Sequence, residues 1–183
     1  MTNMKIGIPR AFLYHRYRHL WEAFFDALGA EYIVSPPTDK AIIRQGTVYA
    51  IDESCLSSKI YLGHVDWLID RCDAVFVPRV ANFGKGKSLC TKFSALYDIV
   101  ANTFYSRNVN ILSYNLDMVE SGGGLAAFYD LGNELGAKRR NTLAAYNVAK
   151  NVEKAELAKE ALRQMQFLER DGMRILVVGH SYN

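Results

Sequence analysis

The stretch KIGIPRAFLYHRYRHLWEAFFDALGAEYIVSPPT, residues 5–38, decides the fold because it joins two short apolar strands through an amphipathic helix. Residues 5–9 predict a buried strand, and residues 11–28 carry apolar side chains at helical spacing. A second short strand follows at residues 32–35. Strand–helix–strand units of this kind form parallel pairs with a right-handed crossover. The opening of the chain therefore predicts a parallel α/β sheet.

The same alternation continues along the chain, with a third strand at residues 74–77 and a fourth at residues 110–114. Further helices are predicted over residues 38–46, 54–71, 92–105, 121–135 and 142–170, the first of them capped by Thr38. We therefore expect an α/β three-layer sandwich around a mainly parallel, Rossmann-like sheet. Its four strands fall within residues 4–9, 31–35, 73–78 and 109–114.

The C-terminal part of the sequence suggests a division into three segments. We expect an α/β domain over residues 1–141, a long connecting helix over 142–171, and the first strand of a second, truncated domain over 172–183. A buried parallel strand normally leads into a covering helix, and almost nothing follows the apolar residues 174–178. We therefore interpret the chain as the N-terminal domain of a longer protein. The alternative is that this last strand completes the first sheet.

Composition narrows the class of protein. The chain has 183 residues, a net charge of +3 and no long basic stripe, so nothing indicates a nucleic-acid partner. No apolar run reaches the length of a membrane span, and no signal peptide is visible. Three widely spaced cysteines do not fit a secreted disulfide scaffold. We expect reduced thiols in the cytoplasm, either without a task or binding metal.

Two arginines follow strands in the same way. Arg10 comes after Pro9, and Arg79 comes after Pro78, which ends the third strand. Both arginines should lie at the C-terminal edge of the sheet, where open α/β sheets bind ligands, and they would suit an anionic ligand such as a phosphate or carboxylate. The alternative is that they cap the following helices or pair with local acids.

The cysteines differ in their surroundings. Cys55 and Cys90 each lie at the predicted start of a helix, where free backbone N–H groups favour a thiolate. Cys72 enters a strand directly, which predicts a core thiol. His64 lies two turns after Cys55, and a lone histidine of this kind is more often structural than a ligand.

Residues 81–88, ANFGKGKS, approximate a phosphate-binding loop in which Gly86, Lys87 and Ser88 would cradle a nucleotide phosphate and its magnesium ion. The first glycine of that pattern is replaced by Ala81, and no strand ending in a magnesium-binding Asp clearly follows. Nucleotide binding therefore stands as an alternative hypothesis.

Taken together, several short motifs along the chain resemble the family of proteins related to activators of 2-hydroxyacyl-CoA dehydratases, the CoA-substrate-specific enzyme activases. The matching residues are Ile6-Gly7-Ile8-Pro9-Arg10-Ala11, Val34-Ser35-Pro36-Pro37-Thr38, Asp52-Glu53-Ser54-Cys55-Leu56, Lys59, Gly63-His64-Val65, Val77-Pro78-Arg79, Cys90-Thr91-Lys92-Phe93 and Gly179-His180-Ser181-Tyr182-Asn183.

This resemblance implies a cytoplasmic protein of an anaerobe, similar in fold to dehydratase subunits that hold a [4Fe–4S] cluster on cysteines. It singles out Cys55 and Cys90 as metal ligands, and Lys59, His64 and Lys92 join the two arginines as candidate ligand-binding residues. It also implies partners: dehydratase subunits, and an ATP-dependent activator that forms a separate module.

The sequence departs from the family pattern where Thr91 replaces a proline after Cys90 and Ser57 replaces one after Leu56. Three hypotheses follow: an iron–sulfur protein of dehydratase activation, a non-catalytic partner module that has lost the cluster, and a nucleotide binder. Two thiolates cannot complete a [4Fe–4S] cluster, so we expect this chain alone to be isolated without one. The substrate, the oligomeric state and whether the chain is itself an enzyme are left open.

Overall fold

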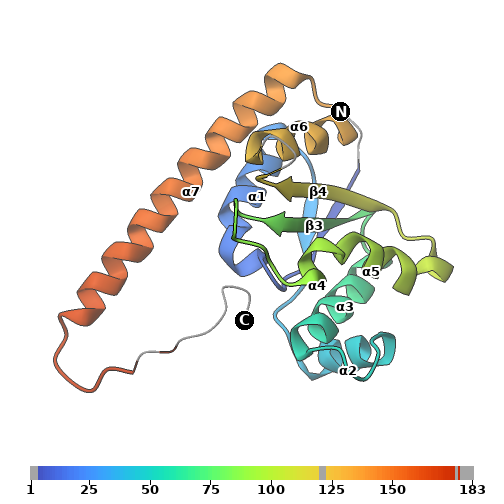
Figure 1. Cartoon of the computed structure of the whole chain (residues 1–183). Coiled ribbons are helices and arrows are strands. Elements are labelled where there is room, and N and C mark those ends of the chain that lie inside the picture. Colours follow the sequence, from blue (N-terminus) through green and yellow to red (C-terminus); the bar gives the residue numbers. More distant parts are fainter. Residues whose placement is uncertain (1–3, 120–122, 176, 178–183) are drawn as a thin grey trace.

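The computed structural model describes residues 4–119, 123–175 and 177, and a four-stranded parallel sheet forms its centre (Figure 1). The strands are β1 (Ile6–Ile8), β2 (Tyr32–Val34), β3 (Ala74–Asn82) and β4 (Ile111–Asp117), in the order β2-β1-β3-β4. Every neighbouring pair is parallel. The predicted α/β sandwich around a parallel sheet is confirmed, and the third strand continues four residues beyond the predicted Pro78.

The strand order places a topological switch point between β1 and β3. The chain moves from β1 outward to β2, then crosses back past β1 to β3 and on to β4. Ile6 of β1 pairs with Tyr32 of β2 on one side and with Ala74 of β3 on the other. In open α/β sheets, ligands bind at the C-terminal edge where the order reverses, so this edge is where a site is expected.

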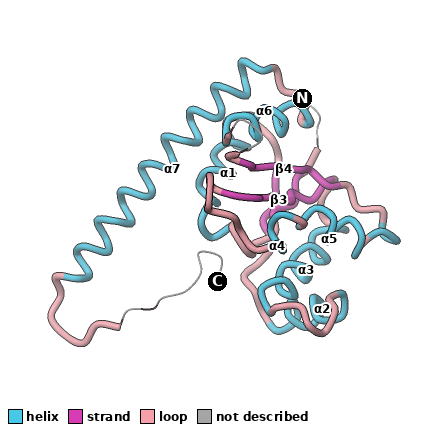
Figure 2. Tube along the Cα trace, in the orientation of Figure 1, coloured by secondary structure: helices cyan, strands magenta, loops and turns pink. Residues whose placement is uncertain are grey.

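Helices follow each strand and cover the sheet on both faces (Figure 2). They are α1 (Tyr14–Leu28), α2 (Lys40–Tyr49), α3 (Leu56–Ile69), α4 (Thr91–Ser94), α5 (Leu96–Thr103), the 3₁₀ turn η1 (Tyr105–Arg107), α6 (Gly124–Glu134) and α7 (Arg139–Leu168). Two expectations need correction. Asp39, not Thr38, caps α2, because its carboxylate accepts a hydrogen bond from the Ile42 N–H at 2.9 Å. The single helix expected over 92–105 is divided into α4 and α5.

Aromatic side chains fill the layer between the sheet, α1 and α6. Trp21 of α1 meets the ring of Phe76 edge-on, with centroids 5.1 Å apart, and Phe128 of α6 packs edge-on against Tyr114 at 5.2 Å. Such edge-to-face pairs are a favoured arrangement for buried aromatic rings. They fix α1 and α6 on one face, which leaves α3, α4 and α5 to cover the other.

An arginine joins η1 to α3. Arg107 donates hydrogen bonds to Asp66 and Asp70 of that helix, at 2.6 Å in each case. One guanidinium thus bridges two carboxylates one turn apart, an arrangement that its planar fork allows. The contact holds the C-terminal half of α3 in place and so helps to fix the orientation of the whole helix.

The long helix α7 packs against the domain over its first half only. Thr142, Ala145, Ala149 and Glu153 are buried, whereas residues 157–168 are mostly exposed and extend past the body of the molecule (Figure 1). The division at residues 141 and 171 stays a prediction. Of the strand expected over 174–178, residues 174, 175 and 177 are described and lie outside any strand. The motif over 179–183 lies outside the described residues.

Candidate functional site

Cys55 is the N-terminal capping residue of α3. Its backbone is extended, with φ −61° and ψ 152°, and α3 begins at the next residue. The thiol is free and exposed, and its sulfur lies 3.2 Å from the hydroxyl oxygen of Ser58 in the first turn of the helix. The predicted position of this cysteine at a helix start is therefore confirmed.

The surroundings of Cys55 favour the thiolate. Partial burial acts to raise the pKa of this thiol, but hydrogen bonds from the Ser58 side chain and backbone and the positive charge of Lys92 together lower it. A lowered pKa and an exposed sulfur are the two properties that make a cysteine a nucleophile or a metal ligand.

Cys90 has the same relation to α4 that Cys55 has to α3. It caps the helix with φ −56° and ψ 144°, and its thiol is also free and exposed. The short helix is held by Arg79, whose Nε donates a 2.6 Å hydrogen bond to the carbonyl oxygen of Ser94. Arg79 lies inside the C-terminal half of β3 and not after the strand as the sequence predicted, and from there it holds the helix that Cys90 caps.

Residues close to the two cysteines in the sequence border one cavity. Ser54, which precedes Cys55, and Lys92, which follows Cys90 by two residues, both line a hollow of about 340 Å³. The influence of Lys92 on the pKa of Cys55 is a second sign that the two helix starts are close. We predict that the two sulfurs lie within about 10 Å of each other, a separation compatible with one compact cluster.

A buried ring stack joins the elements that carry these cysteines. Phe12 stacks on Tyr61 of α3 with centroids 4.9 Å apart, and it contacts Phe93 of α4 at 4.8 Å. Phe12 has a φ of 52°, a value rare for a residue other than glycine. The turn after β1 therefore inserts one ring between α3 and α4.

Three other residues predicted to bind a ligand, Lys59, Arg10 and Lys92, lie in three different parts of the structure. Lys59 donates from Nζ to the backbone oxygen of Asp52 at 3.0 Å, which closes the loop before Cys55. Arg10 follows β1 at the C-terminal edge, and its backbone N–H donates to the Ser35 hydroxyl at 2.8 Å. Lys92 is half-buried beside Cys55, as described above.

His64 is fully buried, and both of its ring nitrogens are hydrogen-bonded. Nδ1 lies 2.8 Å from Ser35 Oγ, and Nε2 lies 2.9 Å from Thr38 Oγ1. Burial, followed by the positive charges of His15 and Arg10, lowers the pKa of this imidazole to about 4. The side chain ties α3 to the segment after β2, which supports the structural alternative over a role as a ligand.

The loop with Gly86, Lys87 and Ser88 forms a tight reverse turn. Ser88 pairs with Asn82 in an antiparallel bridge, and the N–H of Phe83 donates to the Lys87 carbonyl at 3.0 Å. A phosphate-binding loop instead leaves consecutive N–H groups free and leads directly into a helix. The geometry of this loop gives the nucleotide-binding hypothesis no support.

Cys72 lies at the opposite edge of the sheet, before β3. Its thiol is half-buried against the core and donates to the Leu68 carbonyl at 3.2 Å, and burial raises its pKa to about 11. A Cβ on Gly7 would approach its sulfur to 2.5 Å, so the glycine makes room for it. These contacts fit the core thiol that the sequence predicted.

Sequence reasoning missed Ser58 and Phe12. A serine three residues after a helix cap is a detectable signal, because that position faces the cap in the first turn. No comparable signal marks Phe12, since its role depends on the positive φ of the turn. Within the described ranges, no group of three or more His, Cys, Asp or Glu side chains is placed to hold a metal ion.

The fold and the site together define an α/β domain with two exposed, helix-capping thiols and a parallel sheet. The chain belongs to the family described as the CoA enzyme activase uncharacterised domain (DUF2229), whose model matches residues 5–183. The family expected from the sequence motifs is thereby confirmed. No curated protein matches the chain. In the part of the chain that the structure describes, no helix is both long and apolar enough to cross a membrane.

Proposed function

We propose that this domain is an iron–sulfur protein in the activation of a CoA-substrate enzyme, and that Cys55 and Cys90 are its own cluster ligands. The observation that carries the proposal is that both thiols cap helices, and that Ser54 beside Cys55 and Lys92 near Cys90 line one cavity. Family membership supplies the context of CoA enzyme activation. Dehydration of a 2-hydroxyacyl-CoA is the reaction class that the sequence resemblance favours.

The donor set fits part of a [4Fe–4S] cluster. Such clusters are bound through cysteine thiolates, usually four of them, and Cys55 and Cys90 are exposed and free of any disulfide. These two residues would hold half of the ligand set. The other ligands would come from a partner chain, from another part of the protein or from a small molecule. A bound cluster would supply one-electron transfer.

The surrounding residues would prepare the two thiols for this role. The Ser58 hydroxyl stabilises the Cys55 thiolate, and the Lys92 ammonium group offsets its negative charge. Arg79 fixes α4 through the Ser94 carbonyl, so that Cys90 is held at the helix start. Hydrogen bonds and nearby charge at sulfur ligands are the means by which proteins adjust the potential of such clusters.

Partners follow from the incomplete ligand set. An arrangement that exposes two thiols at one edge suits a cluster shared with, or covered by, another protein. We propose dehydratase-type subunits as that protein, with an ATP-dependent activator as the electron donor. Both partner assignments rest on the family and on the sequence resemblance.

The second candidate function is a partner module without a cluster. It is favoured by the small number of thiols at the edge and by the missing prolines after Leu56 and Cys90, because stiffer loops would reduce the cost of ordering a metal site. In that case the same edge would bind a partner through surface contacts alone.

Anaerobic reconstitution distinguishes the two functions. The protein alone, the dehydratase-type subunits alone and the co-expressed complex are each incubated with ferrous iron and sulfide. Bound iron, bound sulfide and the absorbance at about 400 nm are then measured. Cys55→Ser and Cys90→Ser should each abolish the iron that is bound in excess of the subunits alone, whereas Cys72→Ala, the matched control, should retain it. The cluster proposal is contradicted if all variants bind the same amount of iron. It is also contradicted if the complex binds no more iron than the subunits alone, and the partner module is then the better function.

A further inference from the structure

Three positively charged or titratable side chains gather just after β1, apart from the cysteines. Arg10 follows the strand, and His15 and Arg18 lie in the first turns of α1. Residues three apart in a helix share a face, so His15 and Arg18 are neighbours on its surface. Because β1 borders the switch point of the sheet, this cluster lies at the edge where open α/β sheets bind ligands.

The two arginines have no acidic partner among the described residues. Arg16, in the same helix, pairs with Glu153 at 3.7 Å, but neither Arg10 nor Arg18 has a carboxylate within ion-pair distance. Glu22 lies one turn after Arg18, and it accepts a hydrogen bond from the Tyr14 hydroxyl at 2.7 Å instead. A bound anion could therefore accept charge-assisted hydrogen bonds from both guanidinium groups.

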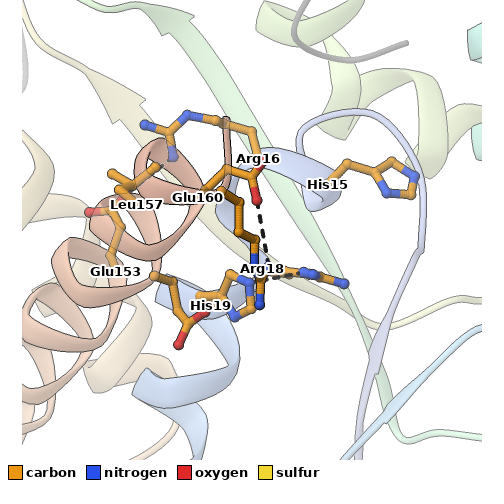
Figure 3. A pocket seen from close by; sticks show the side chains of 9 residues that line it. His15, Arg16, Arg18, His19, Glu153, Leu157 and Glu160 are labelled. Carbon is orange, nitrogen blue, oxygen red and sulfur yellow. Dashed lines mark hydrogen bonds and ion pairs between the residues drawn. The ribbon is translucent and has the colours of Figure 1, made fainter. Parts of the chain in front are cut away.

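The surface around this cluster is hollowed. A cavity of about 370 Å³ lies between α1 and α7 (Figure 3). His15 and Arg18 line its α1 side, and Glu153, Glu156 and Glu160 line its α7 side. Figure 3 shows the Arg18 side chain extending away from Glu153 and Glu160 of α7, toward the side on which His15 lies. Arg18 donates from Nε to Nε2 of His19 at 3.2 Å, which fixes its direction without neutralising its charge.

The positive charges of Arg10 and Arg18 also act on neighbouring titratable groups. Burial lowers the pKa of His15, and the charges of Arg10 and Arg18 lower it further. The same two arginines act on the Tyr14 hydroxyl, which Glu22 opposes, and His15 and Arg10 act on the buried His64. A doubly negative group among these side chains would relieve the repulsion and allow His15 to take up a proton.

We propose that Arg10, His15 and Arg18 bind the phosphate group of a ligand at the switch point of the sheet. The two guanidinium forks donate to phosphate oxygens, and the imidazolium of His15 donates a further hydrogen bond. A phosphate group with two negative charges balances the two arginines and a protonated His15 better than a single carboxylate does. The site does not involve Cys55 or Cys90, so the test of phosphate binding is independent of the proposed cluster.

Nuclear magnetic resonance of the histidine side chains of the full chain tests this proposal. Inorganic phosphate is titrated at constant ionic strength against chloride, and the signal of His15 is followed. We expect a saturable shift of that signal and a rise in the pKa of His15. The double variant R10Q/R18Q should bind phosphate at least about tenfold more weakly, because it loses two charge-assisted contacts.

A control variant and two other anions, chloride and malonate, show whether the binding is specific to this site and to phosphate. R44Q, an exposed arginine of α2, should leave phosphate binding unchanged, and R18Q alone serves if the double variant does not fold. A shift that does not saturate, or that chloride reproduces, would overturn the proposal. Malonate that binds as tightly as phosphate would overturn the assignment to the phosphate class.

Discussion

Nδ1 of His64 lies 2.8 Å from the Ser35 hydroxyl oxygen, and this contact joins α3 to the segment that follows β2. The same hydroxyl accepts a hydrogen bond from the Arg10 N–H at the end of β1. One buried serine thus connects two neighbouring strand ends to the helix that Cys55 caps. The shape of the C-terminal edge therefore depends on a neutral imidazole.

We predict that the protein loses stability as the pH falls from about 6.5 to about 4. The pKa of His64 is lowered from 6.5 to about 4 in the folded state, so between these values only the unfolded state takes up the proton. The contribution is complete above about pH 6.5 and amounts to about 3 kcal/mol, since each unit of pKa is worth 1.36 kcal/mol. Urea unfolding at several pH values measures it.

His64→Gln is the matched variant, because it keeps a polar group at the position but cannot be protonated. Its free energy of unfolding should be lower at pH 7.5, and its slope between pH 6.5 and 4 should be smaller than that of the unmodified protein. An unchanged slope would show that another group causes the pH dependence.

The cysteines should differ in reactivity. At pH 7.5 we expect iodoacetamide to modify Cys55 at least about tenfold faster than Cys72. Cys55 has a lowered pKa and an exposed sulfur, whereas the pKa of Cys72 is raised to about 11 by burial. The greater intrinsic nucleophilicity of a high-pKa thiolate offsets part of this difference. Peptide mass spectrometry over time gives both rates.

Ser58→Ala tests the cause of that reactivity. It removes the hydroxyl group that lies 3.2 Å from the Cys55 sulfur, so the rate at Cys55 should fall while the rate at Cys72 stays constant. In guanidinium chloride the two cysteines should react at similar rates. Equal rates in the folded protein would contradict the predicted difference.

Much of the fold could be predicted because its signals are local. Strands of three to nine residues alternate with amphipathic helices, and Pro78 marks the region where β3 approaches the edge. The extension of β3 to Asn82 could not be predicted, since a proline within a strand usually ends it. The pairing with β4 continues past Pro78 all the same.

The sequence predicted where the individual residues of the candidate site lie, but not the tertiary contacts between them. The positions of Cys55 and Cys90 at helix starts follow from local sequence, whereas the contact between Phe12 and Tyr61 depends on how α1, α3 and β1 pack. His64 shows the same limit. Its sequence neighbours do not reveal that Ser35 and Thr38 would occupy both ring nitrogens.

Gly63 should tolerate no side chain. A Cβ at this position would lie 2.1 Å from the Ile42 carbonyl oxygen of α2, and backbone atoms cannot move aside as a side chain can. We expect Gly63→Ala to lower the free energy of unfolding by about 3 kcal/mol, the upper end of the usual cost of overpacking. Chemical denaturation measures the change.

Gly124→Ala is the control for that variant. Gly124 begins α6, and a Cβ there meets no atom within 4 Å. Because alanine favours the helix over glycine by up to about 1 kcal/mol, this change should be neutral or slightly stabilising. If both substitutions cost the same, close backbone packing between α2 and α3 would not explain the loss at Gly63.

The two halves of α7 should differ in amide hydrogen exchange. Ala145, Ala149 and Glu153 are buried against the domain, and Glu153 also pairs with Arg16 of α1, so residues 139–153 should exchange slowly. Residues 157–168 are mostly exposed, and a helical segment without packing contacts opens readily in water. We expect exchange at least about tenfold faster there. Arg16→Ala should increase exchange near Glu153 but leave the distal half unchanged, whereas uniform protection along α7 would contradict an exposed distal half and the connecting role that we expect for this helix.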